Sequence, residues 1–240
     1  MRDFSQLREL ACRANLDLVA HGLVLGTWGN ASAIDRDAGI VAIKPSGVRY
    51  ADLTPECIVL VSLGGETVSG VMHPSSDLPT HLEVYRAFAD VGGVAHTHSH
   101  AATAFAQACR PLPCLGTTHA DHFCGAVPVT RPLTPAEIRA DYERNTGRVI
   151  AAAFAQIDPL DVPAVLVAHH GPFTWGPDGD AAVQNSVVLE AVARLALDTL
   201  RLAPGAEPIP GPLLQRHFRR KHGAGAYYGQ PPPPAPKRTQ

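Results

Sequence analysis

Short apolar runs bounded by turn residues recur along this chain, and they restrict its fold more than any other feature. Some runs follow one another directly, whereas others are separated by stretches in which apolar residues recur at helical spacing. The expected strands are residues 27–34, 40–43, 57–63, 92–96 and 163–168, and the expected helices are 5–21, 79–89, 101–109, 134–155 and 178–202. This order predicts an α/β fold in which a mixed or antiparallel central sheet is flanked by helices.

Capping residues mark several of the expected helix starts. Thr134 and Glu137 have the spacing of a capping box, with proline at the first helical position between them. Asp178 or Asp180 is expected to begin the last long helix. Asp77 precedes another helix, and the sequence alone is equally consistent with a helix cap or a metal ligand at this position.

Glycine signatures of nucleotide-binding folds are absent from the sequence. No predicted strand is followed by G-x-G-x-x-G or by G-x-x-x-x-G-K-S/T, so a doubly wound nucleotide fold is not expected. A chain of 240 residues is long enough for one large domain with a full core. We expect a single domain over residues 1–230 and a disordered, Pro-rich tail at residues 231–240.

Composition narrows the class of protein. The hydrophobic fraction of 45% is that of a globular protein, and a net charge of −2 gives no reason to expect nucleic acid as a partner. The most apolar long segment, residues 183–202, is interrupted by charges at Glu190, Arg194 and Asp198, so no membrane span is expected. Five cysteines without a C-x-x-C pair suit reduced thiols, and the N-terminus does not resemble a signal peptide. A soluble cytoplasmic protein is therefore expected.

Histidines gather at the ends of two expected strands. His96 and His98 are two residues apart, and side chains at that spacing in a strand point to the same face. Two imidazoles on one face, with one or two further donors, match the requirement of a divalent metal such as zinc. His169 and His170 follow a second apolar strand. The chain has 12 histidines, so chance pairing is the alternative, but the alternating pair favours a metal site.

Three polar segments could hold a phosphate group. They are Gly29-Asn30, residues 44–47 (KPSG) and residues 74–77 (PSSD), and each offers backbone N–H groups beside small polar side chains. Taken singly, each is more typical of a plain turn.

A further polar segment, residues 117–121 (TTHAD), could supply an acid or base. Asp121 lies beside His119 and His122, and structural roles for both histidines remain open. Tyr227 and Tyr228 are typical of surface aromatics. Cys109 and Cys114 are interpreted as core cysteines.

Eight separated motifs together resemble the L-ribulose-5-phosphate 4-epimerase family of the class II aldolase/epimerase superfamily. The resemblance spans about residues 5–230, with the motifs in order and at compatible spacing. The motifs are residues 27–30 (TWGN), 43–48 (IKPSGV), 74–77 (PSSD), 79–81 (PTH), 96–99 (HTHS), 116–121 (GTTHAD), 170–173 (HGPF), and 220–223 (RKHG) with 226–230 (AYYGQ).

This resemblance implies a class II aldolase-like three-layer sandwich with a bound metal, usually Zn²⁺, with Mn²⁺ or Co²⁺ as other candidates. The residues it implies as metal ligands are Asp77, His96, His98 and His170. Those it implies for phosphate binding are Gly29, Asn30, Ser46, Gly47, Ser75 and Ser76. It implies Asp121 and Tyr228 as the acid/base pair, with His217 in support. It also implies a homotetramer with active sites between subunits.

Two positions depart from the family pattern. His100-Ala101 stand where the family often has Arg-His, and His169 stands where it often has Ser. Either extra histidine could ligate a metal by proximity, and only the family register selects His170. Asp77 is the residue found in epimerases, whereas aldolases of the superfamily commonly have Glu at this position.

The implied reaction interconverts L-ribulose 5-phosphate and D-xylulose 5-phosphate by inversion at C4. The C4–H bond is not acidic, so enolisation cannot invert this centre, and the missing dinucleotide signature disfavours oxidation and reduction. Metal-assisted cleavage and re-formation of the C3–C4 bond remains, with Asp121 and Tyr228 transferring protons on opposite sides of C4. The alternatives are a class II sugar-phosphate aldolase and a non-catalytic binding module. L-Arabinose and L-ascorbate are both candidate sources of the substrate.

Overall fold

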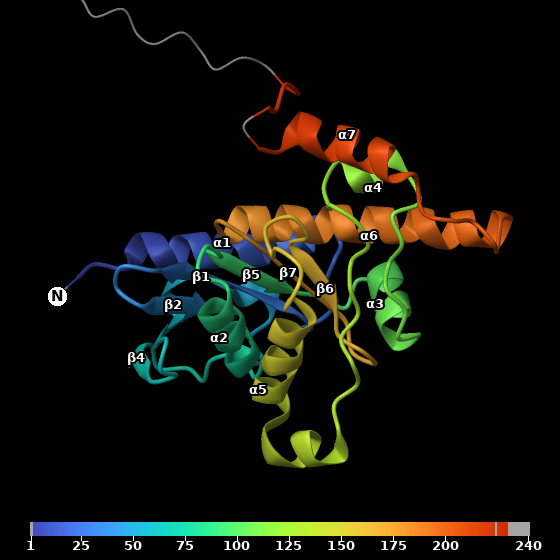
Figure 1. The fold of residues 1–240 in the computed structure, drawn as a ribbon. Helices are drawn as coiled ribbons and strands as arrows, with labels where there is room; N and C mark the ends of the chain where they lie inside the picture. The colour runs from blue at the N-terminus through green and yellow to red at the C-terminus, as the bar shows by residue number, and fades with distance from the viewer. Residues whose placement is uncertain (1, 224, 230–240) are drawn as a thin grey trace, which may run out of the picture.

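A seven-stranded sheet forms the middle of the molecule in the computed structural model, which describes residues 2–223 and 225–229 (Figure 1). Its strands are β1 (Asn30–Asp35), β2 (Ile40–Ile43), β3 (Val59–Ser62), β4 (Thr67–Ser69), β5 (Gly93–His96), β6 (Ala164–Leu166) and β7 (Pro172–Gly176). The strand order is β4-β3-β2-β1-β5-β7-β6, and every neighbouring pair is antiparallel. The predicted α/β class is confirmed, and the sheet is antiparallel. The tail expected at residues 231–240 lies outside the described residues.

Helices cover both faces of this sheet. They are α1 (Ser5–Ala20), α2 (Leu78–Ala87), α3 (His100–Gln107), α4 (Thr117–Ala120), α5 (Pro135–Ala153), α6 (Gly179–Leu202) and α7 (Gly211–Lys221). Helices α1 and α6 pack on one face, α2 and α5 lie on the other, and α7 rests on α4 beyond α6 (Figure 1). The arrangement is the three-layer sandwich expected from the resemblance. None of the helices in the described part of the chain is long and apolar enough to cross a membrane.

Alternation along the strands separates two clusters of apolar side chains. Ile34, Val41 and Ile43 belong to the core cluster that includes α2. Ala33 and Ala42, the neighbours of those residues, belong to the cluster formed with α1. Because side chains alternate between the two faces of a strand, one run of apolar residues supplies both layers of the core. The short alanine side chains face α1.

The helix starts marked by capping residues are largely as predicted. Thr134 accepts a hydrogen bond from the Glu137 N–H while the Glu137 carboxylate accepts one from the Thr134 N–H, which completes the capping box. Asp178, rather than Asp180, caps α6 by accepting from the Ala181 N–H. At Asp77 the side chain makes no capping hydrogen bond. Asp77 occupies the N-cap position of α2, as one of the two interpretations predicted, but its side chain is left free of the helix N–H groups.

Several boundaries and elements differ from the prediction. The strand expected from residue 27 begins only at Asn30, because Gly29 adopts a φ of +76°. A Cβ at Gly29 would lie 2.7 Å from the His96 carbonyl oxygen, so the chain needs glycine there. Strand β5 ends at His96, and His98 lies beyond it. The sequence analysis also missed β4, β7, α4 and α7, and α7 was obscured by the surrounding prolines, which are tolerated in a first helical turn.

The two cysteines interpreted as core residues have different environments. Cys114 is buried, as predicted. Cys109 is partly exposed, has a φ of +52°, and its Sγ lies 3.3 Å from Nε2 of His169. The core interpretation of Cys109 is therefore wrong, because its helix α3 ends two residues earlier and the chain turns outward.

A candidate metal centre at the edge of the β5 strand

Three imidazoles converge where β5 and β7 end side by side. His96 closes β5, His98 follows it, and His170 lies in the turn between β6 and β7. One ring nitrogen from each lies within 4.8 Å of the others. Nε2 of His96 is 3.1 Å from Nε2 of His98, and the His96 and His170 rings have centroids 4.7 Å apart. The structure thus brings together the three histidines that the family register selects.

The second ring nitrogens of two of these histidines have partners. Nδ1 of His96 donates to the Pro172 carbonyl oxygen at 2.9 Å, which leaves Nε2 as the unprotonated nitrogen of a neutral ring. The His96 ring also stacks on Phe173, with centroids 4.1 Å apart. Nδ1 of His170 lies 3.3 Å from the Tyr142 hydroxyl. Contacts of this kind commonly orient histidine ligands in metal sites.

Asp77 shares the cavity with the three histidines. It stands at the start of α2, and its Oδ2 accepts a hydrogen bond from Nδ2 of Asn30 at 2.6 Å. Its carboxylate oxygens are not within the cluster of converging ring nitrogens, although Asp77, His96, His98 and His170 line one cavity.

The protonation states suit a metal ion. Burial lowers the pKa of His96, His98 and His170, so their rings are neutral near neutral pH. Burial acts to raise the pKa of Asp77, but nearby imidazoles and the Asn30 amide outweigh it and hold that pKa below its ordinary value. Neutral imidazoles and an ionised carboxylate are the forms that bind divalent metals. The donor set therefore fits zinc or a similar ion.

The cavity has a volume of about 540 Å³, and the expected phosphate-binding segments form the part of its lining that is here called the rim. The rim residues among those predicted are Gly29, Asn30, Ser46, Gly47, Ser75 and Ser76. All six therefore face the same space as the histidines. Because the rim and the histidines share one cavity, a molecule the size of a sugar phosphate can contact both.

Lys44 also lines this cavity, and sequence reasoning did not single it out. Its side chain is only 2% exposed, and its Nζ lies 4.9 Å from the centre of the Tyr50 ring and 3.4 Å from the Pro45 carbonyl oxygen. Burial lowers the pKa of Lys44. A buried cation beside a polar cavity is suited to an anionic ligand. Lys44 stands in the KPSG segment at residues 44–47, but nothing in that segment predicts that its side chain is buried.

The predicted acid/base residues form a second cluster. Asp121 follows α4, and its Oδ1 accepts hydrogen bonds from Nδ1 of His217 at 3.0 Å and from Nε of Arg220 at 2.9 Å. The Tyr228 ring lies against Arg220, at 5.2 Å from its guanidinium carbon. Within the described part of one chain, none of Asp121, His217 and Tyr228 lines the histidine cavity.

The two extra histidines lie outside the cavity lining. His100 begins α3 and is exposed. His169 has a φ of +62° and contacts Cys109 rather than the converging imidazoles. Of the two histidines left open beside Asp121, His119 is buried, and its Nε2 donates to the Gly125 carbonyl oxygen at 2.7 Å, which is a structural contact.

Comparison with known proteins places these features in a family context. A model of the family described as Class II Aldolase and Adducin N-terminal domain matches residues 9–197. The L-ribulose-5-phosphate 4-epimerase UlaF of Salmonella paratyphi A (strain ATCC 9150 / SARB42) is 49% identical over 225 residues, which cover 94% of this chain and 99% of that protein. A protein of the same name from Salmonella typhi has the same identity and coverage.

Solved structures show the same fold. An L-fuculose 1-phosphate aldolase superposes with a TM-score of 0.76 over 90% of this chain and 96% of its own, and its 24% identity supports the fold alone. The L-fuculose-1-phosphate aldolase of Thermus thermophilus is 27% identical, with a TM-score of 0.64, and the match covers 85% of this chain and 99% of that one.

Proposed function

The chain belongs to the class II aldolase and adducin N-terminal domain family, and we propose that it is a metal-dependent L-ribulose-5-phosphate 4-epimerase. The observation that carries the proposal is the convergence of three neutral imidazoles in a cavity whose rim holds a buried lysine and small polar groups. The cavity matches the two ends of a sugar phosphate, whose hydroxyl and carbonyl oxygens suit a metal and whose phosphoryl group suits the rim. The 49% identity to named epimerases supports this substrate over other sugar phosphates.

His96, His98, His170 and Asp77 would hold the metal, for which Zn²⁺ is our proposal and Mn²⁺ or Co²⁺ the alternatives. When bound, such an ion supplies Lewis-acid stabilisation of negative charge on the substrate oxygens during C3–C4 cleavage. The protein fixes the orientation of the His96 ring through the Pro172 carbonyl oxygen and Phe173. Asn30 holds the Asp77 carboxylate by its amide.

Lys44 and the rim residues would bind the phosphoryl group. Asn30, Ser46 and Ser76 offer neutral donors, and Lys44 adds the positive charge that the neutral donors lack. Charge-assisted hydrogen bonds to phosphate are stronger than neutral ones. Retention of the phosphorylated aldehyde fragment between cleavage and re-formation of the C3–C4 bond depends on these contacts.

Asp121 and Tyr228 would transfer protons on opposite sides of C4, with His217 hydrogen-bonded to Asp121. In one chain these residues and the histidine cavity are separate. Two residues that act on one substrate must meet, so the proposal requires an oligomer in which one subunit supplies the cavity and another supplies Asp121. We propose the homotetramer that the family resemblance implies.

The decisive test is a reaction of the pure, metal-loaded protein with L-ribulose 5-phosphate. We expect D-xylulose 5-phosphate as the main product, with little free glycolaldehyde phosphate. Free aldehyde as the main product would instead support a sugar-phosphate aldolase, the activity named for the Thermus thermophilus structure. No turnover of the sugar phosphate by protein that binds metal would contradict both activities.

A mixing experiment tests the shared site. Asp121→Asn and His98→Ala chains should each be inactive alone and should regain activity together in hybrid oligomers. The control is a mixture of Asp121→Asn with Tyr228→Phe, which should stay inactive because both changes lie in one cluster. Activity that does not return in the first mixture would contradict a site shared between subunits.

A further inference from the structure

Helix α5 consists of two helical segments with a break at Asp141. The backbone there has φ −161° and ψ 82°, which is an extended conformation. Oδ1 of Asp141 accepts a hydrogen bond from the Arg144 N–H at 3.3 Å. A side-chain oxygen that accepts a hydrogen bond from the backbone N–H three residues later is typical of a helix N-cap. Asp141 therefore starts a new segment, and Tyr142 is its first residue.

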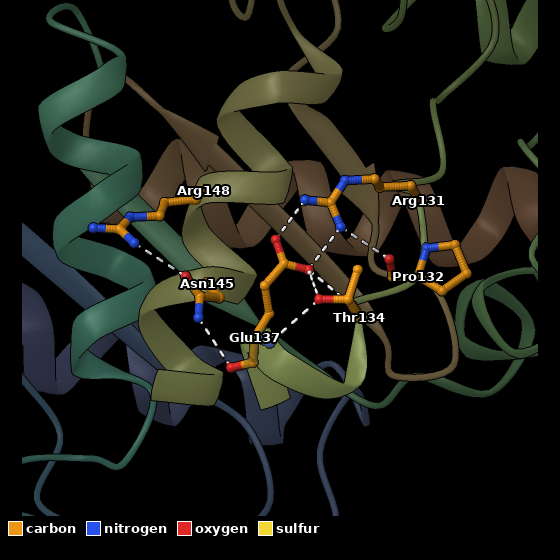
Figure 2. A network of polar contacts seen from close by, with 6 residues as sticks. All are labelled: Arg131, Pro132, Thr134, Glu137, Asn145 and Arg148. Carbon is orange, nitrogen blue, oxygen red and sulfur yellow. Dashed lines mark hydrogen bonds and ion pairs between the residues drawn. The ribbon is translucent and has the colours of Figure 1, made fainter. Parts of the chain in front are cut away.

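The break is held by hydrogen bonds on both sides. Nδ2 of Asn145, in the second segment, donates to the Glu137 carbonyl oxygen of the first at 2.9 Å (Figure 2). The Glu137 side chain is itself fixed by Arg131 and by the capping box with Thr134 (Figure 2). On the other side, Oγ1 of Thr80 in α2 donates to the Glu143 carbonyl oxygen at 2.6 Å. The position of the second segment is therefore set by its neighbours.

This second segment places Tyr142 beside His170. The hydroxyl oxygen of Tyr142 lies 3.3 Å from Nδ1 of His170, and the two ring centroids are 6.2 Å apart. The contact parallels the one made by His96, whose Nδ1 donates to a carbonyl oxygen. If Nδ1 of His170 donates to the phenol, Nε2 is left unprotonated and free to bind a cation. Tyr142 itself is not among the residues lining the cavity.

We propose that Tyr142 is a positioning residue, which orients the His170 ring and fixes its tautomer for metal binding, and that the break at Asp141 exists to place it. The proposal rests on the proposed function in so far as it requires a metal at the histidines. It concerns metal affinity rather than the identity of the sugar, so it can be tested without substrate.

The first test is Tyr142→Phe, which removes the hydroxyl and keeps the ring. Zn²⁺ affinity is measured by competition with a chromophoric chelator, and the visible spectrum of the Co²⁺-loaded protein reports ligand geometry. We expect affinity to fall about 10- to 100-fold, as is typical when the partner of a metal-bound histidine is removed, with a changed Co²⁺ spectrum. Tyr227→Phe is the matched control, because Tyr227 is 69% exposed; it should leave both measurements unchanged.

The second test uses the break itself. Asp141→Ala removes the capping acceptor and should weaken metal binding in the same direction as Tyr142→Phe. Asp141→Ser keeps an oxygen that caps about as well as aspartate, so it should restore near wild-type affinity. A purely structural role for Asp141 would change the melting temperature of the metal-free protein without changing the Co²⁺ spectrum.

The outcomes separate the inference from the function on which it rests. Wild-type affinity and spectrum in Tyr142→Phe would overturn the positioning role while leaving the metal site intact. A wild-type protein that binds no Zn²⁺ or Co²⁺ at the histidines would overturn both. Weakened binding in Tyr142→Phe together with rescue by Asp141→Ser would support the proposal even if the sugar substrate proved to be different.

Discussion

The histidine cavity and the Asp121 cluster are both built from titratable side chains, but their charges are arranged in opposite ways. In the cavity, three neutral imidazoles and one carboxylate face open space, and a lysine is buried on the rim. Around Asp121, a single carboxylate is already surrounded by His217, Arg220 and Lys221. The first arrangement gains stability when a cation and an anion bind. The second is satisfied within the chain. The difference supports the proposal that the cavity is the ligand-binding part of the site and that Asp121 belongs to a separate cluster whose charge is balanced within the chain.

The largest effect should come from removing a cavity histidine. His98→Ala is expected to abolish activity and to lose the metal, because it removes one of the three histidines whose ring nitrogens converge among the described residues. The loss should exceed the roughly 10- to 100-fold cost of removing a partner that only orients a ligand. Elemental analysis and activity after addition of a chelator measure both effects. His169→Ala is the matched control and should keep the ion, since His169 contacts Cys109 instead. Full metal content in His98→Ala would contradict the proposal that the histidine cavity is the metal site.

Removing a proton-transfer group should affect the rate and leave the cavity unchanged. Asp121→Asn and Tyr228→Phe are each expected to lower the epimerase rate by about 10²–10⁴-fold, the range typical of general acid/base groups. Metal content should stay at the wild-type level in both variants, because neither residue lines the cavity in its own chain. Steady-state kinetics and elemental analysis of the same preparations test this pair of expectations. Near wild-type rates would show that the second cluster is structural only.

Changing the rim should affect binding of the phosphoryl end. Lys44→Met removes the buried charge with little change in length, and hydrogen bonds to charged groups contribute about 1.5–3 kcal/mol. The expected loss is about 10- to 100-fold in kcat/KM for L-ribulose 5-phosphate. The same variant should lose little with unphosphorylated L-ribulose, which the wild type should already use very poorly. Comparable kcat/KM values for the two sugars in the wild type would contradict the assignment of the rim.

The residues of the histidine cavity could be predicted from the sequence better than those of the Asp121 cluster, because several of them stand together in short motifs. His96 and His98 are recognisable where an apolar strand ends, and His170 follows a second apolar strand. Metal ligands are drawn from few residue types, so their spacing is informative. The TTHAD segment alone made Asp121 a candidate acid or base, whereas only the family resemblance added Tyr228 and His217 and grouped the three residues. Asp121 and His217 are 96 residues apart, and the helix carrying His217 was hidden among prolines.

The helix break at Asp141 and the burial of Lys44 could not be predicted from the spacing of apolar residues. Asp141 looks like any polar residue on the exposed side of a helix, so residues 134–155 read as one continuous element, and the position of Tyr142 beside His170 could not be predicted. Lysine is usually exposed, so the burial of Lys44 had no sequence signal of its own. In both cases the structural feature depends on contacts that local sequence patterns do not encode.

The smallest effect concerns stability, and it tests whether the Asp121 cluster is satisfied within the chain. Burial acts to raise the pKa of Asp121, but hydrogen bonds from Arg220 and His217 outweigh it and hold the pKa below its ordinary value. A carboxyl with a lowered folded-state pKa contributes stability above the pKa it has when unfolded, and that stability is lost as the pH falls through the folded-state pKa. Asp121→Asn should therefore have a lower melting temperature than the wild type at about pH 6. Each kcal/mol of stability that is lost should lower the melting temperature by about 2–4 °C.

This difference in melting temperature should shrink as the pH is lowered below the ordinary pKa of an aspartate and through the lowered folded-state pKa of Asp121, because protonation of the wild-type carboxyl removes its ionic contacts. Asp198→Asn is the matched control, since the Asp198–Arg201 pair is exposed and surface ion pairs contribute little. Its melting temperature should follow the wild type at every pH. An Asp121→Asn difference that stays constant with pH would mean that the cations around Asp121 are not bound to an ionised carboxylate. The contrast between an open, ligand-accepting cavity and a closed, self-neutralised cluster would then no longer hold.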